Sequence, residues 1–177
     1  MKTTLRFTVA IAVAFTLSTG ISAKGATSRI TITGKTLANP IEITEASIIS
    51  KFQVWEGPGT TVCRGGRANC TDGTQGFIID WLSGPVAERP EGLPRYEVSF
   101  YVTDVRFSGQ PGPEQLAYVV SYEYDPAASQ GFVYLPGDGD QRYPLNSTSI
   151  HRGGRQGKWY HASAAWQSVV LPLVARR

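Results

Sequence analysis

The run RYEVSFYVTDVRF, Arg95 to Phe107, and the run LAYVVSYEY, Leu116 to Tyr124, decide the fold of this chain. In both runs hydrophobic and polar side chains alternate with a period of two, which is the pattern of a strand with one buried face. The connection between them, SGQPGPEQ, contains the glycines and prolines of a turn. The two runs therefore predict a long antiparallel hairpin at the centre of the molecule.

Shorter runs with the same alternation lie on both sides of the hairpin. They are separated by glycines and prolines, which are typical of turns between strands. We expect these further strands at 29–33 (RITIT), 40–44 (PIEIT), 76–82 (GFIIDWL), 131–136 (GFVYLP) and 147–152 (STSIHR).

Two segments have the period of a helix, one over about 45–52 and one over about 164–175. Pro172 interrupts the second pattern, and proline lacks the N–H donor and clashes with the preceding turn, so we expect a kink or a break near Leu171. The two apolar stripes are Ile48, Phe52 and Trp55, and Trp166, Val169, Val170, Leu173 and Val174.

This order of elements predicts a mainly β fold. We expect an antiparallel sheet curled into a small barrel or sandwich, covered by the two short helices at about 45–52 and 164–175. The sequence shows neither internal repeats nor a second domain. Residues 24–177 are therefore expected to form a single exported β-rich domain.

The amino-terminal segment has the composition of a secretory signal. Lys2 and Arg6 give a positive start, residues 7–17 are an apolar core, and 21–23 (ISA) offer a small-residue cleavage site. The apolar core is shorter than the roughly 20 residues that a membrane-spanning helix needs. We expect residues 1–23 to be a cleaved signal and the protein to be secreted or periplasmic, without a membrane span after cleavage; an uncleaved anchor is the alternative.

The charge balance argues against nucleic-acid binding. The formal net charge is +3, and it falls to +1 without Lys2 and Arg6. Proteins that bind nucleic acid carry a basic face or stripe, whereas the basic residues of this chain are spread along it. We therefore expect no nucleic acid among its partners.

The two cysteines, Cys63 and Cys70, stand in the stretch CRGGRANC and are the only ones in the chain. In an oxidising compartment two such cysteines form a disulfide, while redox pairs have two intervening residues and cysteine metal sites need about four ligands. We predict a structural bridge between them. The closed loop would display Arg64 and Arg67 to a partner or to water, and the sequence leaves both open.

Candidate catalytic residues are few, and none is predicted to be catalytic. His151 and His161 lack a G-x-S-x-G serine to work with, and paired cysteines exclude thiol catalysis. Asp80 interrupts the apolar run FIIDWL, where a salt-bridged or solvent-facing role is the ordinary interpretation. A hydrolase would need a second carboxylate close to it, and the candidates for this partner are Glu97, Asp104 and Glu123.

No cofactor or metal site is predicted either. The stretch GPGT, 57–60, lacks the lysine and the following helix of a phosphate loop. The stretch GDGD, 137–140, lacks the later glutamate of a calcium loop.

Tyrosine and tryptophan are frequent, and they suit both a sheet core and a binding surface. Trp55 and Trp81 are the candidates for partner contacts. The runs IISKFQVWEGPGT, GFIIDWLSGPV, LPRYEVSFYV, GFVYLPGDGD and KWYHASAAW together resemble a family of small exported bacterial proteins of unassigned function. This resemblance implies one exported domain and supplies no activity.

The function expected from the sequence is therefore that of an exported, non-enzymatic β-domain. It would bind an unknown protein or envelope component through its loops and aromatic residues. The alternative is a hydrolase of a cell-wall or sugar polymer that uses paired carboxylates.

Overall fold

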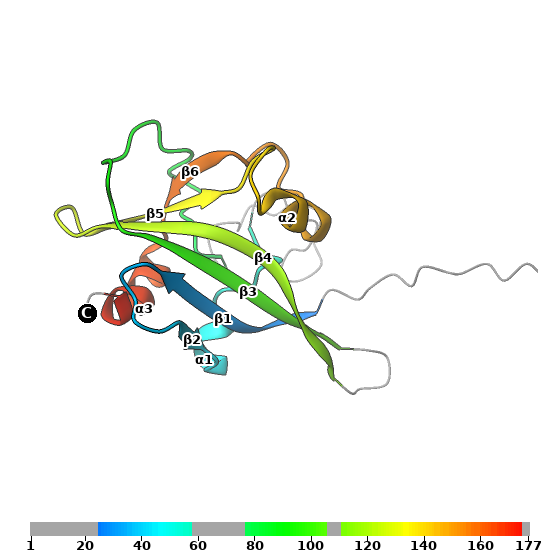
Figure 1. The fold of residues 1–177 in the computed structure, drawn as a ribbon. Coiled ribbons are helices and arrows are strands. Elements are labelled where there is room, and N and C mark those ends of the chain that lie inside the picture. Colours follow the sequence, from blue (N-terminus) through cyan, green and yellow to red (C-terminus); the bar gives the residue numbers. More distant parts are fainter. Residues whose placement is uncertain (1–24, 58–76, 106–110, 175–177) are drawn as a thin grey trace, which may run out of the picture.

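A computed structural model of the chain describes residues 25–57, 77–105 and 111–174. They form one antiparallel sheet of six strands in the order β2-β1-β3-β4-β5-β6, together with three helices (Figure 1). The strands are β1 Ala26–Gly34, β2 Ile41–Ile43, β3 Arg95–Val105, β4 Pro111–Asp125, β5 Gln130–Leu135 and β6 Lys158–His161. The helices are α1 Ala46–Ile49, α2 Tyr143–Ser149 and α3 Ala164–Val174.

The predicted central hairpin is confirmed. Strands β3 and β4 pair over most of their length, with Val98 opposite Val120 and Tyr96 opposite Tyr122. The register shifts after Phe100, so that Ala117 is an additional residue in β4, as in a β-bulge. The mainly β, antiparallel character of the fold is thus as predicted, although the sheet does not close on itself.

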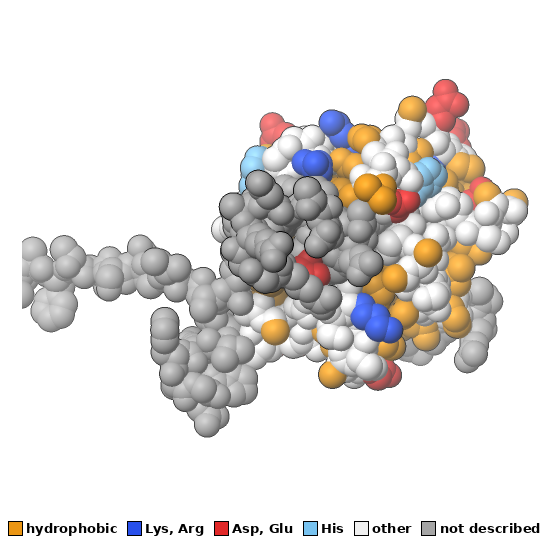
Figure 2. All heavy atoms as spheres, turned by 180° about the vertical axis from the view of Figure 1, so that it is seen from behind, with side chains coloured by type: hydrophobic (Ala, Val, Ile, Leu, Met, Phe, Trp, Pro, Cys, Tyr) orange, Lys and Arg blue, Asp and Glu red, His pale blue; other side chains and the backbone are white. Residues whose placement is uncertain are grey.

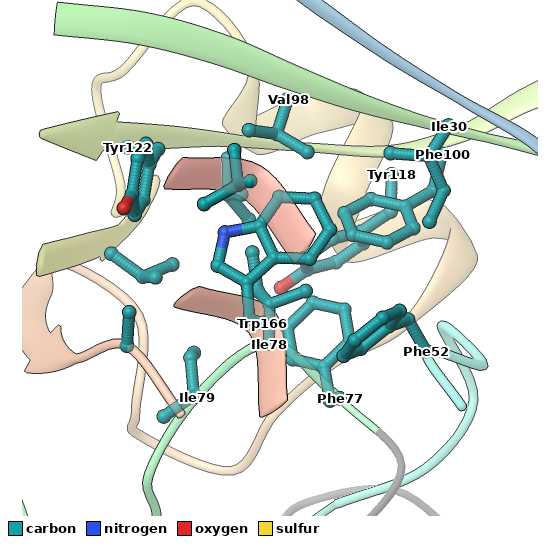
Figure 3. Packing of buried hydrophobic residues seen from close by; sticks show 14 of the residues in the cluster. Ile30, Phe52, Phe77, Ile78, Ile79, Val98, Phe100, Tyr118, Tyr122 and Trp166 are labelled. Atoms are coloured by element: carbon teal, nitrogen blue, oxygen red, sulfur yellow. The ribbon is translucent and has the colours of Figure 1, made fainter. Parts of the chain in front are cut away.

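The core lies against the face of the sheet that carries the alternating apolar side chains. Trp166 of α3 stands at its centre and is fully buried (Figure 3). Its ring meets Phe52 edge-on at a centroid distance of 5.2 Å and Tyr122 at 6.3 Å. Removing a buried tryptophan typically costs about 3–5 kcal/mol, so this one residue ties α3 and the segment after α1 to the sheet.

Both predicted helices exist, with different bounds. Helix α1 has four residues, and Phe52 follows it in a turn in which its N–H bonds to the carbonyl of Ile49. The break expected near Leu171 is wrong, because α3 runs through Pro172 to Val174. Pro172 lies in the last turn, where its missing donor affects only the carbonyl of the exposed Ser168, which water can reach.

The strand predicted at 147–152 is wrong, because Tyr143–Ser149 form helix α2. Pro144 stands in its first turn, where the fixed φ of proline favours a helix and the missing donor costs nothing. The described part of the strand predicted at 76–82 is only partly as predicted, because Ile79 forms an isolated bridge with Ala162 and no regular strand; Pro85, further along, forms a second bridge with Tyr160. No helix in the described ranges is long and apolar enough to cross a membrane.

Candidate functional site

The face of the sheet opposite the core is polar, and antiparallel pairing arranges its side chains in rows across the strands. Thr33 of β1 stands opposite Glu97 of β3, and Glu97 stands opposite Ser121 of β4. The row continues to Tyr134 of β5. These residues are far apart in sequence, and the register alone brings them together.

A groove of about 640 Å³ opens over this row at one end of the sheet. One wall is the turn after β1, and the other is the chain that leads into β3. Six of its ten lining residues are polar or charged, and the lining consists of Thr33, Gly34, Lys35, Thr36, Leu93, Pro94, Arg95, Tyr96, Glu97 and Ser121.

Arg95 connects the groove to a buried ion pair. Its Nε donates to Glu123 Oε1 at 2.7 Å, and Arg89 donates to Glu123 Oε2. The Glu123 side chain is 3% exposed, whereas that of Arg95 is 59% exposed. A buried carboxylate between two arginines keeps the guanidinium of Arg95 in place at the groove while leaving much of it in contact with solvent.

Glu97 is the acidic side chain of the groove, and it is already paired. Arg142, just before α2, donates from Nε to Oε2 at 3.0 Å and from Nη2 to Oε1 at 2.9 Å. This two-bond geometry fixes the carboxylate. The groove and its ion pairs have a local excess of two positive charges. The cations are Lys35, Arg89, Arg95 and Arg142, and the anions are Glu97 and Glu123.

Trp159 lies beside this cluster and is partly buried. The guanidinium of Arg89 covers it at 4.0 Å from the centroid, and the ring of Tyr134 packs against it at a centroid distance of 5.1 Å. The Tyr134 hydroxyl in turn donates to Asp140 Oδ2 at 2.8 Å. Trp159 is therefore already packed against a guanidinium and a ring, and it belongs to the local structure around Arg89 and Tyr134.

Asp80 has a local structural role. Its Oδ1 accepts from the backbone N–H of Leu82 at 3.1 Å, and its Oδ2 accepts from the Ser83 hydroxyl at 2.6 Å. The hydrogen bond from the Ser83 hydroxyl, with those from the backbone N–H groups of Ser83 and Leu82, keeps the pKa of Asp80 below its usual value. Burial acts in the opposite direction. The carboxylate therefore shapes the turn 80–84, and no described arginine pairs with it.

The other carboxylates and both histidines are not brought into a catalytic arrangement in the described ranges. Glu97 and Glu123 each accept hydrogen bonds from arginine. His151 is exposed, and the ring of His161 packs against Phe132 at a centroid distance of 5.4 Å. Neither histidine is hydrogen-bonded to a serine or a carboxylate of the described residues. The side chain of Asp104 lies outside them.

The two tryptophans predicted to contact a partner are partly buried and pack against the core. Trp55 donates from its indole nitrogen to the carbonyl of Gly25. Trp81 stacks on Phe77 at 6.4 Å and meets Tyr160 edge-on at 5.3 Å. The other predicted site residues, Cys63, Arg64, Arg67 and Cys70, lie outside the described residues.

The sequence analysis missed Arg152, the second-largest fully buried side chain among the described residues. Its guanidinium carbon lies 4.4 Å from the ring centroid of Phe77 and 5.1 Å from that of Tyr118. Nη2 donates to the carbonyl of Val54 at 2.6 Å, and Nη1 donates to that of Glu56 at 3.2 Å. The surrounding glycines and arginines of RGGRQG suggest a solvated loop, so no sequence signal indicated this burial.

The face of the molecule seen in Figure 2 has no basic stripe where its side chains are described: Lys and Arg lie in small separate groups among hydrophobic and uncharged side chains. No cluster of three or more potential metal ligands is formed within the described ranges.

Comparisons with protein-family models, with curated proteins and with solved structures found no match to this chain. The resemblance to small exported bacterial proteins therefore stays a prediction.

Proposed function

We propose that this chain is a non-enzymatic binding domain whose groove beside β1 and β3 holds a ligand with an anionic group. The observation that carries the proposal is the charge of the groove. Lys35 and Arg95 are exposed on its lining, while its one carboxylate, Glu97, is already held by Arg142. An anionic oxygen group between Lys35 and the solvent-exposed part of the Arg95 guanidinium would balance the excess positive charge.

The size and lining of the groove support a small, polar ligand. Ligand sites typically have volumes of roughly 300–1,000 Å³, and the groove falls within that range. The hydroxyls of Thr33, Thr36 and Ser121 add hydrogen-bond donors and acceptors around the two cations. A carboxylate of a peptide or of an acidic sugar has the chemistry that this lining recognises.

The proposed setting is outside the cytoplasm, and the support for it is the signal pattern of residues 1–23. A protein or envelope component that carries carboxylates is the partner class that we propose. Arg64 and Arg67 stay candidates for contacts with the same partner. The hydrolase alternative has no observation in its favour at Asp80, Glu97 or Glu123, since each of these carboxylates is engaged by arginine or by a turn.

Titration with acetate and inorganic phosphate, followed by amide chemical shifts at constant ionic strength, tests the proposal. We expect weak binding, with a Kd of about 1 mM, and shifts centred on 33–36 and 95–97. K35Q and R95Q should each weaken binding several-fold. K51Q makes the same change of charge at an exposed lysine outside the groove and should bind like the wild type. Uniform small shifts, or equal loss in all three variants, would refute an anion site in the groove.

A further inference from the structure

The interior of the protein contains a second, separate cationic centre around Arg152. Arg152, Tyr118 and Phe77 are at most 2% exposed, and the ring of Trp81 lies 5.6 Å from the guanidinium carbon. No carboxylate in the described ranges forms a salt bridge with Arg152. Aromatic faces and two backbone carbonyls are its neighbours, and these provide partial negative charge only.

Several polar atoms of this centre are buried without a hydrogen-bond partner. They are Arg152 Nε, the Tyr118 hydroxyl and Trp81 Nε1. Burial raises the pKa of Tyr118, and the positive charge of Arg152 opposes this rise in part. The charge of Arg152 therefore acts on the Tyr118 hydroxyl. The Tyr118 hydroxyl and the Arg152 guanidinium thus act on each other in a dry environment, where Nη1 and Nη2 of Arg152 have backbone partners and Nε has none.

Such an arrangement is unusual for a folded protein. Buried polar groups almost always have a partner, and unmatched buried donors point to a bound water or ion. Water would satisfy the donors, but it would leave the charge of Arg152 without a counter-charge. An anion would satisfy both requirements with the same hydrogen bonds.

We propose that Arg152, Tyr118 and Trp81 form an internal site for one small monoatomic anion of the halide class, such as chloride. We choose a monoatomic ion because the polar atoms of the site are closed to solvent, and it is the smallest form that an anion can take. It is incorporated as the protein folds and acts as a structural ligand of the native state. This site is independent of the groove proposed above.

Thermal unfolding in chloride and in gluconate, at equal ionic strength, gives the first test. A ligand that binds only the native state raises the unfolding midpoint with its concentration, so we expect a higher midpoint in chloride. Y118F removes the hydroxyl and retains the ring, and it should lose most of this difference. Y134F makes the same change at a tyrosine whose hydroxyl bonds to Asp140, and it should retain the difference in full.

Crystals grown in bromide give the second test, and they need no variant. We expect an anomalous difference peak within hydrogen-bond distance of Arg152 Nε. Density at that position without an anomalous signal would identify water and overturn the proposal. A midpoint that is the same in both salts would overturn it as well, and neither result bears on the groove.

Discussion

The side chain of Asn146 in α2 forms two hydrogen bonds with the backbone of Val119 in β4. A neighbouring strand would form the same pair of bonds. Asn146 Oδ1 accepts from the Val119 N–H at 2.8 Å, and Asn146 Nδ2 donates to the Val119 carbonyl at 2.6 Å. Strand β5 pairs with β4 only from Ser121 onward. The side chain of Asn146 therefore extends the pairing of β4 where no strand is present.

Replacing Asn146 should destabilise the fold strongly. In N146A the N–H and the carbonyl of buried Val119 both lose their partner, and each such loss costs about 1–3 kcal/mol. We expect a loss of about 2–4 kcal/mol in urea unfolding. T148A, on the exposed side of the same helix, is the control and should change stability by less than about 1 kcal/mol. A small effect of N146A would show that water replaces the amide.

The two glutamates of the polar face should respond differently to neutralisation. E123Q leaves Arg89 and Arg95 around a buried amide, and because both arginines reach solvent we expect a cost of about 1–3 kcal/mol, below that of breaking a fully buried pair. E97Q breaks a pair in which both side chains are more than a third exposed, and such pairs contribute about 0–1 kcal/mol. Urea unfolding at low and high salt measures both. Similar losses of stability in the two variants would contradict the burial of Glu123 and the exposure of Glu97.

Gly131 of β5 should not tolerate a side chain. A Cβ at this position would lie 2.7 Å from both Cε2 and the hydroxyl of Tyr122, a ring that is fully buried. Overpacking of this kind costs about 1–3 kcal/mol. Thermal unfolding of G131A should show the loss, and a midpoint equal to the wild type would mean that Tyr122 can move aside.

The contribution of Asp80 to stability should depend on pH. Its pKa is lowered in the folded state, mainly by the hydrogen bond from Ser83, so its stabilising effect is present above the unfolded pKa near 3.8. The effect is lost as the pH falls through the lower, folded pKa. The difference in unfolding midpoint between the wild type and D80A should therefore be full at pH 6 and shrink below about pH 4. A constant difference across this range would refute the role of the charge.

The predicted bridge between Cys63 and Cys70 can be checked by mass. The purified protein should gain the mass of two hydrogen atoms on reduction and bind two alkylating groups only after reduction. The same measurement tests the predicted signal cleavage, after which we expect the chain to begin near Lys24. Alkylation without prior reduction would show free thiols and refute the bridge.

The sequence was most informative where a single period runs over a long stretch. Strands β3 and β4 alternate over nine or more residues, and their pairing follows from that pattern. Helix α2 has only seven residues, too few for a hydrophobic stripe to stand out, and Pro144 was the one signal that could have indicated it.

The candidate groove could not be read from the sequence because it depends on register. Thr33, Glu97 and Ser121 form one row only because β1 and β4 pair with β3 at those positions. Arg152 posed a different difficulty: burial of an arginine is decided by the packing of Phe77 and Tyr118 around it, and no local pattern encodes this. Asp80 was recognised as unusual, but its turn partners became visible only in the structure.

Both edges of the sheet are poorly suited to pairing with a strand of a second molecule. Asp80 and Val86 donate their N–H groups to β6, and between them residues 81–84 leave the edge in a turn closed by the Asp80 carboxylate. At the opposite edge β2 is three residues long and follows Pro40. Exposed strand edges are templates for aggregation, and natural proteins block them with short strands, prolines and irregular segments. A second molecule would have to displace residues 80–86 at one edge, and at the other it could pair with only the three residues of β2, so concentrated solutions should resist fibre growth.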